Sequence, residues 1–554
     1  MSITHDTTAL LEAARAWLVE DPDPATRAEL EALVDRVESG DAAALADLAD
    51  RFDGTLEFGT AGLRGALGAG PNRMNRVVVT RAAAGLVAHL KEQGAGVSDA
   101  VVIGFDARHN SDVFARDTAE IVTGAGLRAH LLPRPLPTPV LAFAIRDLGC
   151  VAGVMVTASH NPPQDNGYKV YLGDGSQIVP PVDSQIAAKI AAVGSILDVP
   201  RGPGGEVLDE QVVEWYRSTV VNLLPEGPRD LKVVYTAMHG VGGETFTTVL
   251  EAAGFPPPVL VEAQFQPDPE FPTVAFPNPE EPGAIDLALA LAQESGADLV
   301  VANDPDADRC AVAISGPHGW RMLRGDEVGA LLAHHLLGRS KAGVYATSIV
   351  SSSVLARLAA AHGQPHLETL TGFKWISRIQ GLAFGYEEAL GYCVDPEHVR
   401  DKDGISAGLV LCELAAEAKA AGRTLGDILD DIAREHGLHA TDQLSVRFTD
   451  VTGIAAAMER LRTTPPVTLG GYAVKKVEDL ALGSEHLPPT DGLRYTLAEG
   501  ARVIVRPSGT EPKVKCYLEV VVPVDEEDGV EAARIAAAGR LDAIKGDVKA
   551  AAGL

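Results

Sequence analysis

The sequence predicts an α/β protein with three consecutive α/β domains of similar size, followed by a smaller C-terminal α+β domain. The chain has 554 residues, about twice the length that one hydrophobic core supports. Helical spacing of apolar residues alternates with short apolar runs, which is typical of mostly parallel sheets with helices on both faces. From about residue 438, strand-like runs dominate around two helical segments. We expect domains at 1–208, 209–323, 324–437 and 438–554.

The first domain begins with two expected packing helices, 7–18 and 24–50, the second preceded by a stop-and-cap signal. A small-residue loop with one arginine, 58–65, follows; alone, it is equally consistent with an ordinary glycine turn. The alternation then continues with the strands and helices at 80–93, 100–105, 111–126, 127–132, 139–148 and 151–156. Residues 173–208 are rich in glycine, proline and aspartate, so we expect a loop and a domain boundary there.

The second and third domains repeat the alternation of strand and helix. In the second we expect helices at 209–223, 243–253 and 283–295 and strands at 231–236 and 298–302. In the third we expect helices at 325–337, 350–362, 404–421 and 425–436 and strands at 343–346, 366–370 and 382–385. In such sheets ligands bind at the carboxyl ends of the strands.

The last domain changes character. Strands are expected at 443–448, 471–477, 493–497, 501–505 and 514–521, with helices at 452–462 and 528–550. This mixture indicates a small α+β domain.

Composition excludes several classes of function. Lys+Arg 47 against Asp+Glu 76 gives a net charge of −29, which argues against nucleic acid or an anionic membrane as a partner. The 5 cysteines are scattered without CxxC spacing, a pattern of reduced cytoplasmic proteins without a zinc site. From the acidic residues near the N-terminus we expect no signal peptide, and no apolar run reaches the roughly 18 residues of a membrane span.

Ser159 lies where an apolar run stops at small polar residues and then at Asn161-Pro162. This pattern predicts a buried strand ending in a tight turn that presents the serine hydroxyl. An ordinary turn serine remains open at this point. Although His160 is adjacent, neighbouring residues rarely let an imidazole take a hydroxyl proton, and no Gly-x-Ser-x-Gly elbow is present. Phosphoryl transfer therefore suits this serine better than acyl transfer.

Asp304, Asp306 and Asp308 follow an apolar strand at alternate positions. Three converging carboxylates are tolerable around a cation, and oxygen-only ligands favour Mg²⁺ or Mn²⁺ over zinc. An EF-hand is excluded because its sixth position is Arg309 and its twelfth is Ser315. A solvated acidic turn is the alternative.

Further candidate loops carry anion and sugar contacts. The segment Arg506-Pro-Ser508-Gly509-Thr510 resembles a phosphate cradle, with Lys513 adding charge, and the alternative is an ordinary turn. No P-loop or well-placed GxGxxG occurs. Glu387 and Glu388 would accept hydrogen bonds from sugar hydroxyls, although a surface acidic pair is as consistent. In the loop that contains Arg400, Lys402 and Asp403 we expect either a second anion contact or a helix start.

Taken in order, Thr-Ala-Ser-His-Asn-Pro, Asp-Pro-Asp-Ala-Asp-Arg, Glu-Glu-Ala-Leu-Gly and Arg-Pro-Ser-Gly-Thr-Glu-Pro occur once per expected domain. Over nearly its whole length the chain resembles the α-D-phosphohexomutase superfamily. The resemblance implies a heart-shaped arrangement of four domains, the first three sharing one topology. It implies an isomerase of the phosphoglucomutase or phosphomannomutase type.

The resemblance also implies roles for individual residues. Ser159 would carry the phosphoserine, and Mg²⁺ would be held by Asp304, Asp306, Asp308 and the Ser159 phosphate. Glu387 and Glu388 match the sugar-recognition loop. The residues that match the loop gripping the phosphate not being transferred are Arg506, Ser508, Gly509 and Thr510. Those that match the lining of the reaction centre are Arg64, His160, Lys169 and Lys374, and Arg309 follows the metal loop as it does in relatives.

One departure bears on the sugar. Many phosphoglucomutases and phosphomannomutases have a serine after the glutamates, where this chain has Ala389. The variant Glu-Glu-Ala-Leu-Gly, followed by Asp-Lys-Asp-Gly-Ile-Ser, looks like the branch with bacterial phosphoglucomutases, phosphopentomutases and a glucose-1,6-bisphosphate synthase. We therefore expect a sugar 1-phosphate/6-phosphate mutase, with glucose favoured, and mannose phosphate, pentose phosphate or bisphosphate synthesis as alternatives.

The expected mechanism passes through a sugar bisphosphate, which also serves as activator. Phospho-Ser159 gives its phosphoryl group to a free sugar hydroxyl, and the other phosphate returns to the serine. His160 and Lys374 are both candidates for the base, and movement of the last domain as a lid is expected. A different class, an inactive sugar-phosphate sensor, is disfavoured by the presence of Ser159 and all three aspartates. A cytoplasmic monomer or homodimer with a phosphosugar substrate is expected.

Overall fold

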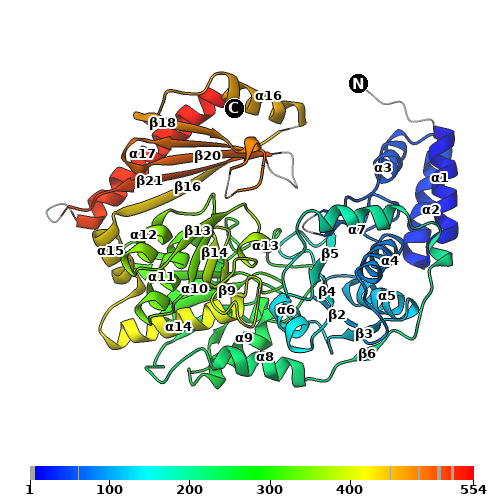
Figure 1. The fold of residues 1–554 in the computed structure, drawn as a ribbon, viewed down its shortest axis with the longest axis horizontal. Coiled ribbons are helices and arrows are strands. Elements are labelled where there is room, and N and C mark those ends of the chain that lie inside the picture. Colours follow the sequence, from blue (N-terminus) through cyan, green and yellow to red (C-terminus); the bar gives the residue numbers. More distant parts are fainter. Residues whose placement is uncertain are drawn as a thin grey trace. The chain divides into compact units, whose positions relative to one another are not determined.

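The computed structural model describes residues 7–59, 62–448, 451–484, 487–507, 513–525 and 529–553. The chain divides into two compact units. Unit 1 comprises residues 1–322 and 392–416, and unit 2 comprises residues 323–391 and 417–554. The ribbon is shown in Figure 1.

Three N-terminal helices, α1 (Thr7–Glu20), α2 (Pro24–Glu38) and α3 (Ala42–Phe52), pack around a shared apolar cluster. The single helix expected over 24–50 is wrong, because the chain turns between α2 and α3. Gly40 has φ +90°, a conformation that continues no helix and that glycine adopts readily. The Asp41 carboxylate then accepts hydrogen bonds from the main-chain N–H groups of Ala43 and Ala44 and caps α3.

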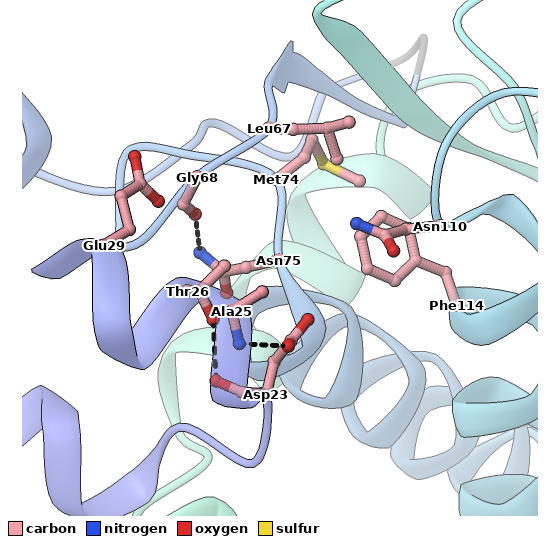
Figure 2. Close-up of a pocket in the computed structure, with 10 residues that line it drawn as sticks. All are labelled: Asp23, Ala25, Thr26, Glu29, Leu67, Gly68, Met74, Asn75, Asn110 and Phe114. Atoms are coloured by element: carbon pink, nitrogen blue, oxygen red, sulfur yellow. Dashed lines mark hydrogen bonds between the residues drawn. The ribbon is translucent and has the colours of Figure 1, made fainter. Parts of the chain in front are cut away.

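A cavity of about 200 Å³ lies between the N-terminal half of α2 and the first sheet domain (Figure 2). Asp23, Thr26 and Asn75 line part of it, and each is already engaged locally. Asp23 caps the first turn of α2, and the Asn75 side chain donates to the carbonyl oxygens of Gly68 and Gly70. None of the site residues expected from the sequence lines this cavity.

The first sheet of unit 1 has six strands in the order β1-β5-β4-β2-β3-β6. Strands β4, β2, β3 and β6 are parallel, whereas β5 is antiparallel to both β4 and β1. Helices α4, α5 and α7 lie on one side of the sheet and α6 on the other (Figure 1). The strands are β1 (Leu63–Ala66), β2 (Ala100–Phe105), β3 (Arg128–Leu131), β4 (Ala152–Val156), β5 (Asp165–Leu172) and β6 (Glu206–Val207). The helices are α4 (Arg76–Glu92), α5 (Ser111–Gly124), α6 (Thr138–Asp147) and α7 (Val182–Ala191).

Strand β5 is absent from the sequence expectations, and it makes the sheet mixed. The segment expected as a loop over 173–208 likewise contains α7, a short 3₁₀ helix and β6. Because Gly, Pro and Asp are frequent there, local propensity pointed to a loop, but α7 packs on α4. Packing therefore overrides local composition in this segment.

The second sheet of unit 1 has five strands in the order β11-β10-β9-β7-β8. Strands β9, β7 and β8 are parallel, whereas β10 is antiparallel to both β9 and the edge strand β11. The strands are β7 (Val233–Thr236), β8 (Val259–Leu260), β9 (Leu299–Asn303), β10 (Cys310–Gly316) and β11 (Gly319–Met322). The helices are α8 (Gln211–Val221), α9 (Gly242–Ala252) and α10 (Asp286–Ser295).

Unit 2 contains a third parallel set of strands in the order β13-β12-β14. They are β12 (Val344–Ser348), β13 (His366–Thr369) and β14 (Leu382–Glu387). The helices are α11 (Gly325–Gly338), α12 (Val354–Ala361), α13 (Phe373–Ile376) and α15 (Leu425–His436). Two elements include a boundary between the units, β15 (Gly391–Cys393) and α14 (Gly404–Ala420).

The C-terminal part of unit 2 is a six-stranded antiparallel sheet with the order β16-β21-β20-β19-β18-β17. Helix α17 packs on it together with α16. Its strands are β16 (Leu438–Arg447), β17 (Thr468–Leu469), β18 (Tyr472–Asp479), β19 (Leu493–Leu497), β20 (Arg502–Pro507) and β21 (Lys513–Val522). Its helices are α16 (Val451–Thr463) and α17 (Gly529–Ala552). The expected α+β domain is confirmed.

The three parallel sets share one order, with the third strand, the first and the second side by side: β4-β2-β3, β9-β7-β8 and β14-β12-β13. This confirms three similar α/β domains. Within the described part of the chain, no helix has the length and apolar character needed to cross a bilayer.

Candidate active site

Ser159 lies in a strained turn after the fully buried strand β4. Its φ is +50°, in the left-handed region that side chains other than glycine seldom adopt. The Ser159 N–H donates to the Thr157 Oγ1 at 2.9 Å, which closes the turn. Such strain persists only where surrounding contacts enforce it, and it is concentrated at functional sites.

Arg108 supplies those contacts. Its guanidinium donates to the carbonyl oxygens of Ser159 (2.7 Å), Pro162 (2.8 Å) and Asp165 (3.1 Å), and also to that of Asn161. The arginine is 4% exposed, so its donors are largely committed to the loop. Arg108 belongs to none of the sequence motifs, although its position shortly after the end of strand β2 was a usable signal.

The Ser159 hydroxyl has two close partners. Its Oγ lies 2.8 Å from Asp304 Oδ2 and 3.1 Å from His160 Nδ1. The neighbouring imidazole therefore lies within hydrogen-bond distance of the hydroxyl, a contact that adjacent residues rarely make. A hydroxyl has one proton, so it donates to one of these partners and accepts from, or only lies near, the other.

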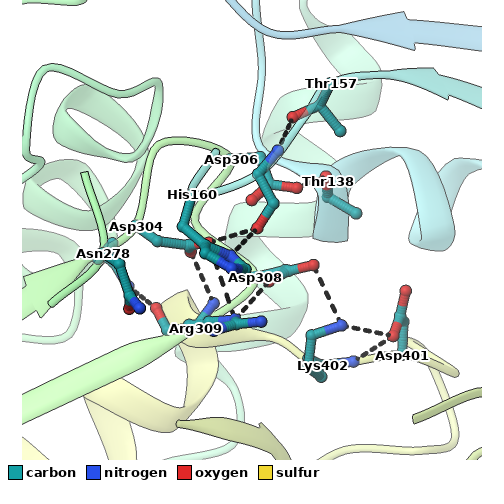
Figure 3. Close-up of polar contacts among 12 residues, drawn as sticks. Thr138, Thr157, His160, Asn278, Asp304, Asp306, Asp308, Arg309, Asp401 and Lys402 are labelled. Atoms are coloured by element: carbon teal, nitrogen blue, oxygen red, sulfur yellow. Dashed lines mark hydrogen bonds and ion pairs between the residues drawn. The ribbon is translucent and has the colours of Figure 1, made fainter. Parts of the chain in front are cut away.

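The aspartates lie in a tight turn between β9 and β10 (Figure 3). Ala307 has φ +55°, and its N–H donates to the Asp304 carbonyl oxygen at 2.8 Å. Asp304 and Asp306 are 0% exposed and Asp308 is 1% exposed. One oxygen from each carboxylate lies within 4.8 Å of the others. This burial excludes the solvated acidic turn.

Two lysines and a threonine hold these carboxylates. Lys169 Nζ, from β5, lies 2.7 Å from Asp306 Oδ2 and 2.9 Å from Asp308 Oδ2. Lys402 Nζ lies 3.1 Å from the same Asp308 oxygen, and Thr138 Oγ1 donates to Asp306 Oδ2 at 2.7 Å. Thr138 is a partner that the sequence analysis missed, because it begins a helix distant in sequence and carries no motif.

The second carboxylate oxygens of Asp306 and Asp308 have different surroundings. Asp306 Oδ1 and Asp308 Oδ1 are buried and have no hydrogen-bond partner among the described residues. Leaving such acceptors unsatisfied costs free energy unless a cation is bound. The donor set is all oxygen, as Mg²⁺ and Mn²⁺ require. The aspartate turn therefore fits a divalent metal ion.

Charge is unevenly distributed within the turn. Burial, reinforced by the two neighbouring aspartates, raises the pKa of Asp304 well above its ordinary value. Burial and Asp308 also act to raise the pKa of Asp306, but the ion pair with Lys169 and the Thr138 hydrogen bond outweigh them and lower it. The carboxylates of Asp306 and Asp308 thus overcome burial and raise the pKa of Lys169, which stays protonated.

Two arginines add positive charge. Arg309 Nε lies 4.0 Å from Asp304 Oδ2 and 4.0 Å from Asp308 Oδ1. Arg64, in β1, donates to the Asn161 Oδ1 at 3.1 Å, so it is attached to the serine turn. Burial, and next Arg309 and Arg64, hold the pKa of His160 well below its ordinary value. The structure thus brings Arg64, Ser159, His160, Lys169 and Arg309 together with the aspartates.

The loop 398–404 caps a helix and also contributes a cation to the aspartate turn. Asp403 Oδ1 accepts hydrogen bonds from the N–H groups of Ile405 and Ser406, which caps α14, and Lys402 pairs with Asp308. Gly404 is required here, because a Cβ would lie 2.1 Å from the Arg309 carbonyl oxygen. Arg400 makes no described contact with the aspartate turn.

The glutamate pair lies in unit 2 at the end of β14, and the two carboxylates have different partners. Glu387 Oε1 accepts from the Gly372 N–H at 2.7 Å. Glu388 Oε2 accepts from Ser348 Oγ at 3.1 Å and Ser351 Oγ at 3.0 Å. Burial, then Glu387 and Asp326, raises the pKa of Glu388 to about 7.

The remaining expected residues also lie in unit 2. Lys374 is in the short helix α13, two residues after Gly372. Arg506 is near the end of β20 and Lys513 begins β21. Ser508, Gly509 and Thr510 lie outside the described residues.

Four family models match the chain in sequence order. They are described as phosphoglucomutase/phosphomannomutase α/β/α domains I, II and III and the C-terminal domain, and they match residues 55–196, 214–316, 324–436 and 446–537.

Individual proteins agree with the family models. A probable phosphomannomutase of Haemophilus influenzae is 50% identical, covering 80% of this chain and 93% of its own. A Staphylococcus haemolyticus phosphoglucomutase is 36% identical, covering 85% and 91%. The solved structure of a putative phosphomannomutase from Thermus thermophilus is 28% identical with a TM-score of 0.69, covering 87% and 98%. The chain therefore belongs to the phosphoglucomutase/phosphomannomutase family of the α-D-phosphohexomutase superfamily, and is an enzyme of the isomerase class.

Proposed function

We propose that this phosphosugar mutase interconverts the 1-phosphate and 6-phosphate of a hexose, with glucose as the first choice, through a phosphoserine at Ser159. One observation carries the proposal. The Ser159 hydroxyl is presented by a strained turn 2.8 Å from Asp304, in a carboxylate cluster with unsatisfied buried oxygens. A hydroxyl that carries a phosphoryl group beside a metal site is suited to phosphoryl transfer.

The proposed metal ligands are Asp304, Asp306, Asp308 and a phosphate oxygen on Ser159. When bound, one Mg²⁺ per chain would neutralise charge on the transferring group. Lys169 and Thr138 orient the aspartates by occupying one oxygen of Asp306 and leaving the other for a cation. Such outer partners fix the direction of a ligand's lone pairs.

The proposed reaction has two transfers. In the first, the bond between Ser159 Oγ and phosphorus breaks and a bond from a sugar hydroxyl oxygen to the same phosphorus forms, which gives the bisphosphate. In the second, the other phosphate's bond to the sugar breaks and its phosphorus bonds to Ser159 Oγ. Arg64, Lys169 and Arg309 supply the positive charge that stabilises the spread negative charge.

A proton must also move. The attacking sugar hydroxyl loses one, and the serine oxygen or the released sugar oxygen gains one. His160 and Lys374 are the two candidate carriers, and the His160 ring is the one described beside Ser159 Oγ. Substituting each in turn and following single-turnover transfer separates them.

Recognition of the sugar and its second phosphate is assigned to other residues. We propose that Glu387 and Glu388 bind the sugar hydroxyls, because both residues lie at the end of β14. A further set is proposed for the phosphate that is not transferred, namely Arg400, Arg506, Ser508, Gly509, Thr510 and Lys513. The domain division at 208, 323 and 437 remains part of this proposal.

The identity of the sugar rests on the relatives and on residue 389. Relatives named for mannose and for glucose both match, and Ala389 lacks the hydroxyl that many relatives have. Mannose phosphate is therefore the second candidate, supported by the 50% identical relative. We further propose a cytoplasmic monomer or homodimer without nucleic-acid or membrane partners, consistent with the net charge of −29.

A substrate panel with the phosphorylated enzyme tests the proposal. Glucose 1-phosphate, mannose 1-phosphate and ribose 1-phosphate are compared, with glucose 1,6-bisphosphate as activator. The proposal expects the highest kcat/KM for glucose 1-phosphate. Preference for mannose or ribose would overturn the sugar assignment but keep the mechanism. Turnover of all three by Ser159→Ala, or turnover unaffected by a chelator, would overturn the mechanism.

A further inference from the structure

A serine-rich loop, residues 348–353, joins β12 to α12. Its sequence Ser-Ile-Val-Ser-Ser-Ser has four hydroxyls in six positions. Ser348 is 0% exposed, and Ser351 and Ser352 are each 1% exposed. Buried hydroxyls need partners, so this loop must make specific polar contacts on the inside of unit 2. These contacts reach two parts of unit 2, namely Glu388 and the C-terminal sheet.

The first direction leads to Glu388. Ser351 Oγ accepts a hydrogen bond from the Glu388 N–H at 3.1 Å and lies 3.0 Å from Glu388 Oε2. Ser348 Oγ lies 3.1 Å from the same carboxylate oxygen and 2.9 Å from Ser351 Oγ. One serine therefore holds both the main chain and the carboxyl group of Glu388.

The glutamate has little freedom to move elsewhere. Helix α11 begins directly against it, since a Cβ on Gly325 would lie 1.9 Å from the Glu388 carbonyl oxygen. Leu390, two residues on, has φ +64°, so the turn is also conformationally constrained. The direction in which the carboxyl group points is thus set mainly by Ser348 and Ser351.

The second direction leads to the C-terminal sheet. Arg502, in β20, donates to the Ser351 carbonyl oxygen and pairs with Glu519 of β21. Glu519 Oε1 accepts hydrogen bonds from Ser352 Oγ at 2.6 Å and from the Ser353 N–H at 2.8 Å. Glu519 is 2% exposed, and its buried charge is compensated by Arg502, with further contacts from Ser352, Ser353 and His439.

An apolar cluster reinforces this junction. Ile349 and Val350 of the loop pack with Leu370, Ile504 and Tyr517. Arg502 also reaches Glu368 in β13, at 3.2 Å. The loop is therefore bonded to the C-terminal sheet on one side and to Glu388 on the other.

Helix capping alone does not explain Ser351. The N-cap residue of α12 is Ser353, whose side chain makes no capping hydrogen bond, and Ser352 Oγ accepts from the Val354 N–H at 3.2 Å. The Ser353 Oγ contacts His439 Nδ1 at 3.1 Å. Only Ser348 and Ser351 of the loop's four serines contact the Glu388 carboxylate through their described hydroxyls.

We propose that Ser351 is a positioning residue for sugar selectivity: its hydroxyl directs the Glu388 carboxyl group, and Arg502 of the C-terminal sheet fixes Ser351 in turn. The inference rests on the proposed sugar-recognition role of Glu388. Residue 389 is an alanine in this chain and has no hydroxyl. We infer that Ser348 and Ser351 support the Glu388 carboxyl group in its place. The chemical class recognised is the hydroxyls of a sugar phosphate, whose positions a rigid carboxyl group distinguishes by geometry.

The test compares Ser351→Ala with Ser353→Ala, a matched loss of one hydroxyl from the same loop. KM and kcat are measured for glucose 1-phosphate and mannose 1-phosphate on the phosphorylated full-length enzyme. For Ser351→Ala we expect KM of the preferred sugar to rise about 10-fold, since the hydrogen bonds of this hydroxyl to the carboxyl group and N–H of Glu388 are lost. The preference between the two sugars should shrink by a similar factor, with kcat nearly unchanged. Ser351→Thr, which keeps a hydroxyl, should restore the preference, and Ser353→Ala should leave it unchanged.

Equal loss for both sugars through kcat alone, or an unchanged KM, would overturn the inference. If Ser351→Ala does not fold, Ser351→Cys tests the same hydrogen bonds with a side chain of similar size. The link to the C-terminal sheet is tested by combining Ser351→Ala with Arg502→Lys. Non-additive effects on KM are expected, because Arg502 acts through Ser351, and additive effects would overturn the link. A wild-type enzyme inactive on every sugar phosphate would instead overturn the proposed function.

Discussion

Thr138 contacts an aspartate of the proposed metal site but belongs to none of the sequence motifs. It directs Asp306 by donating to Oδ2 at 2.7 Å, while Oδ1 stays without a described partner. Thr138→Val removes the donor at nearly constant volume. We expect affinity for Mn²⁺ to fall about 10–100-fold, the usual effect of losing an outer partner of a metal ligand. Manganese titration followed by electron paramagnetic resonance measures this. Thr138→Ser should bind almost normally, and an unchanged affinity in Thr138→Val would contradict the geometry.

Glu388 predicts a pH dependence. Burial, then Glu387 and Asp326, raises its pKa to about 7, so below that pH it is largely neutral and accepts hydrogen bonds poorly. The KM for the sugar phosphate should therefore rise as the pH falls through about 7. Glu388→Gln cannot titrate and should show only the titration of the substrate phosphate, near pH 6. Identical profiles for both enzymes would refute this assignment.

The raised pKa of Glu388 also makes the stability of the folded chain depend on pH. The folded chain keeps a proton on Glu388 that the unfolded chain releases near its ordinary value of 4.5. This group therefore contributes stability below about pH 4.5 that is lost as the pH rises to about 7.

At the scale of elements, the serine turn depends on the strand end next to it. Arg108 reaches four carbonyl oxygens of residues 159–165 from the end of β2. Arg108→Lys keeps the charge but loses the planar set of donors. We expect kcat to fall about 100-fold, because a displacement near 1 Å at a reacting group has this effect. Steady-state kinetics measures it, with the exposed Arg116→Lys as the control. Retention of full kcat would show that the clamp is dispensable.

The start of α14 also constrains the metal turn. Gly404→Ala would place a Cβ 2.1 Å from the Arg309 carbonyl oxygen, so the backbone on one side must shift. We expect weaker metal binding and a lower urea midpoint of unfolding. Gly546→Ala in α17 is the matched control, since no atom lies within 4 Å of its added Cβ, and it should stabilise by up to about 1 kcal/mol. Equal metal affinity in both variants would argue against the close approach.

The elements that the sequence predicted and those it did not differ physically. Helix α14 was expected over 404–421 and begins at Gly404, because the Asp403 cap and a continuous apolar pattern agree. Strand β5 was missed because it contains Asn166 and Lys169, both buried and polar. Those side chains are inside because they bind Ser111 and the aspartates, which lie far away in sequence. Local pattern cannot reveal such partners.

At the scale of the whole molecule, the order of four short motifs predicted the family and the four-domain architecture. The motifs also identified the residues that the structure gathers in unit 1 around the aspartate turn. The sequence did not reveal Arg108, Thr138 or Ser351, whose contacts depend on how separate elements meet. Unit 1 contains the groups proposed for transfer, and unit 2 contains Glu387 and Glu388, proposed for recognition.

On the proposed mechanism, Ser159 carries the phosphoryl group that reaches the product. The most direct measurement incubates the enzyme with ³²P-labelled glucose 1,6-bisphosphate, locates the label by peptide mapping, and then adds unlabelled glucose 1-phosphate. The account predicts up to one phosphoryl group per chain on Ser159, its transfer into sugar phosphate on the chase, and no labelling of Ser159→Ala. Label on another residue, label that fails to chase, or mutase turnover by Ser159→Ala would contradict it.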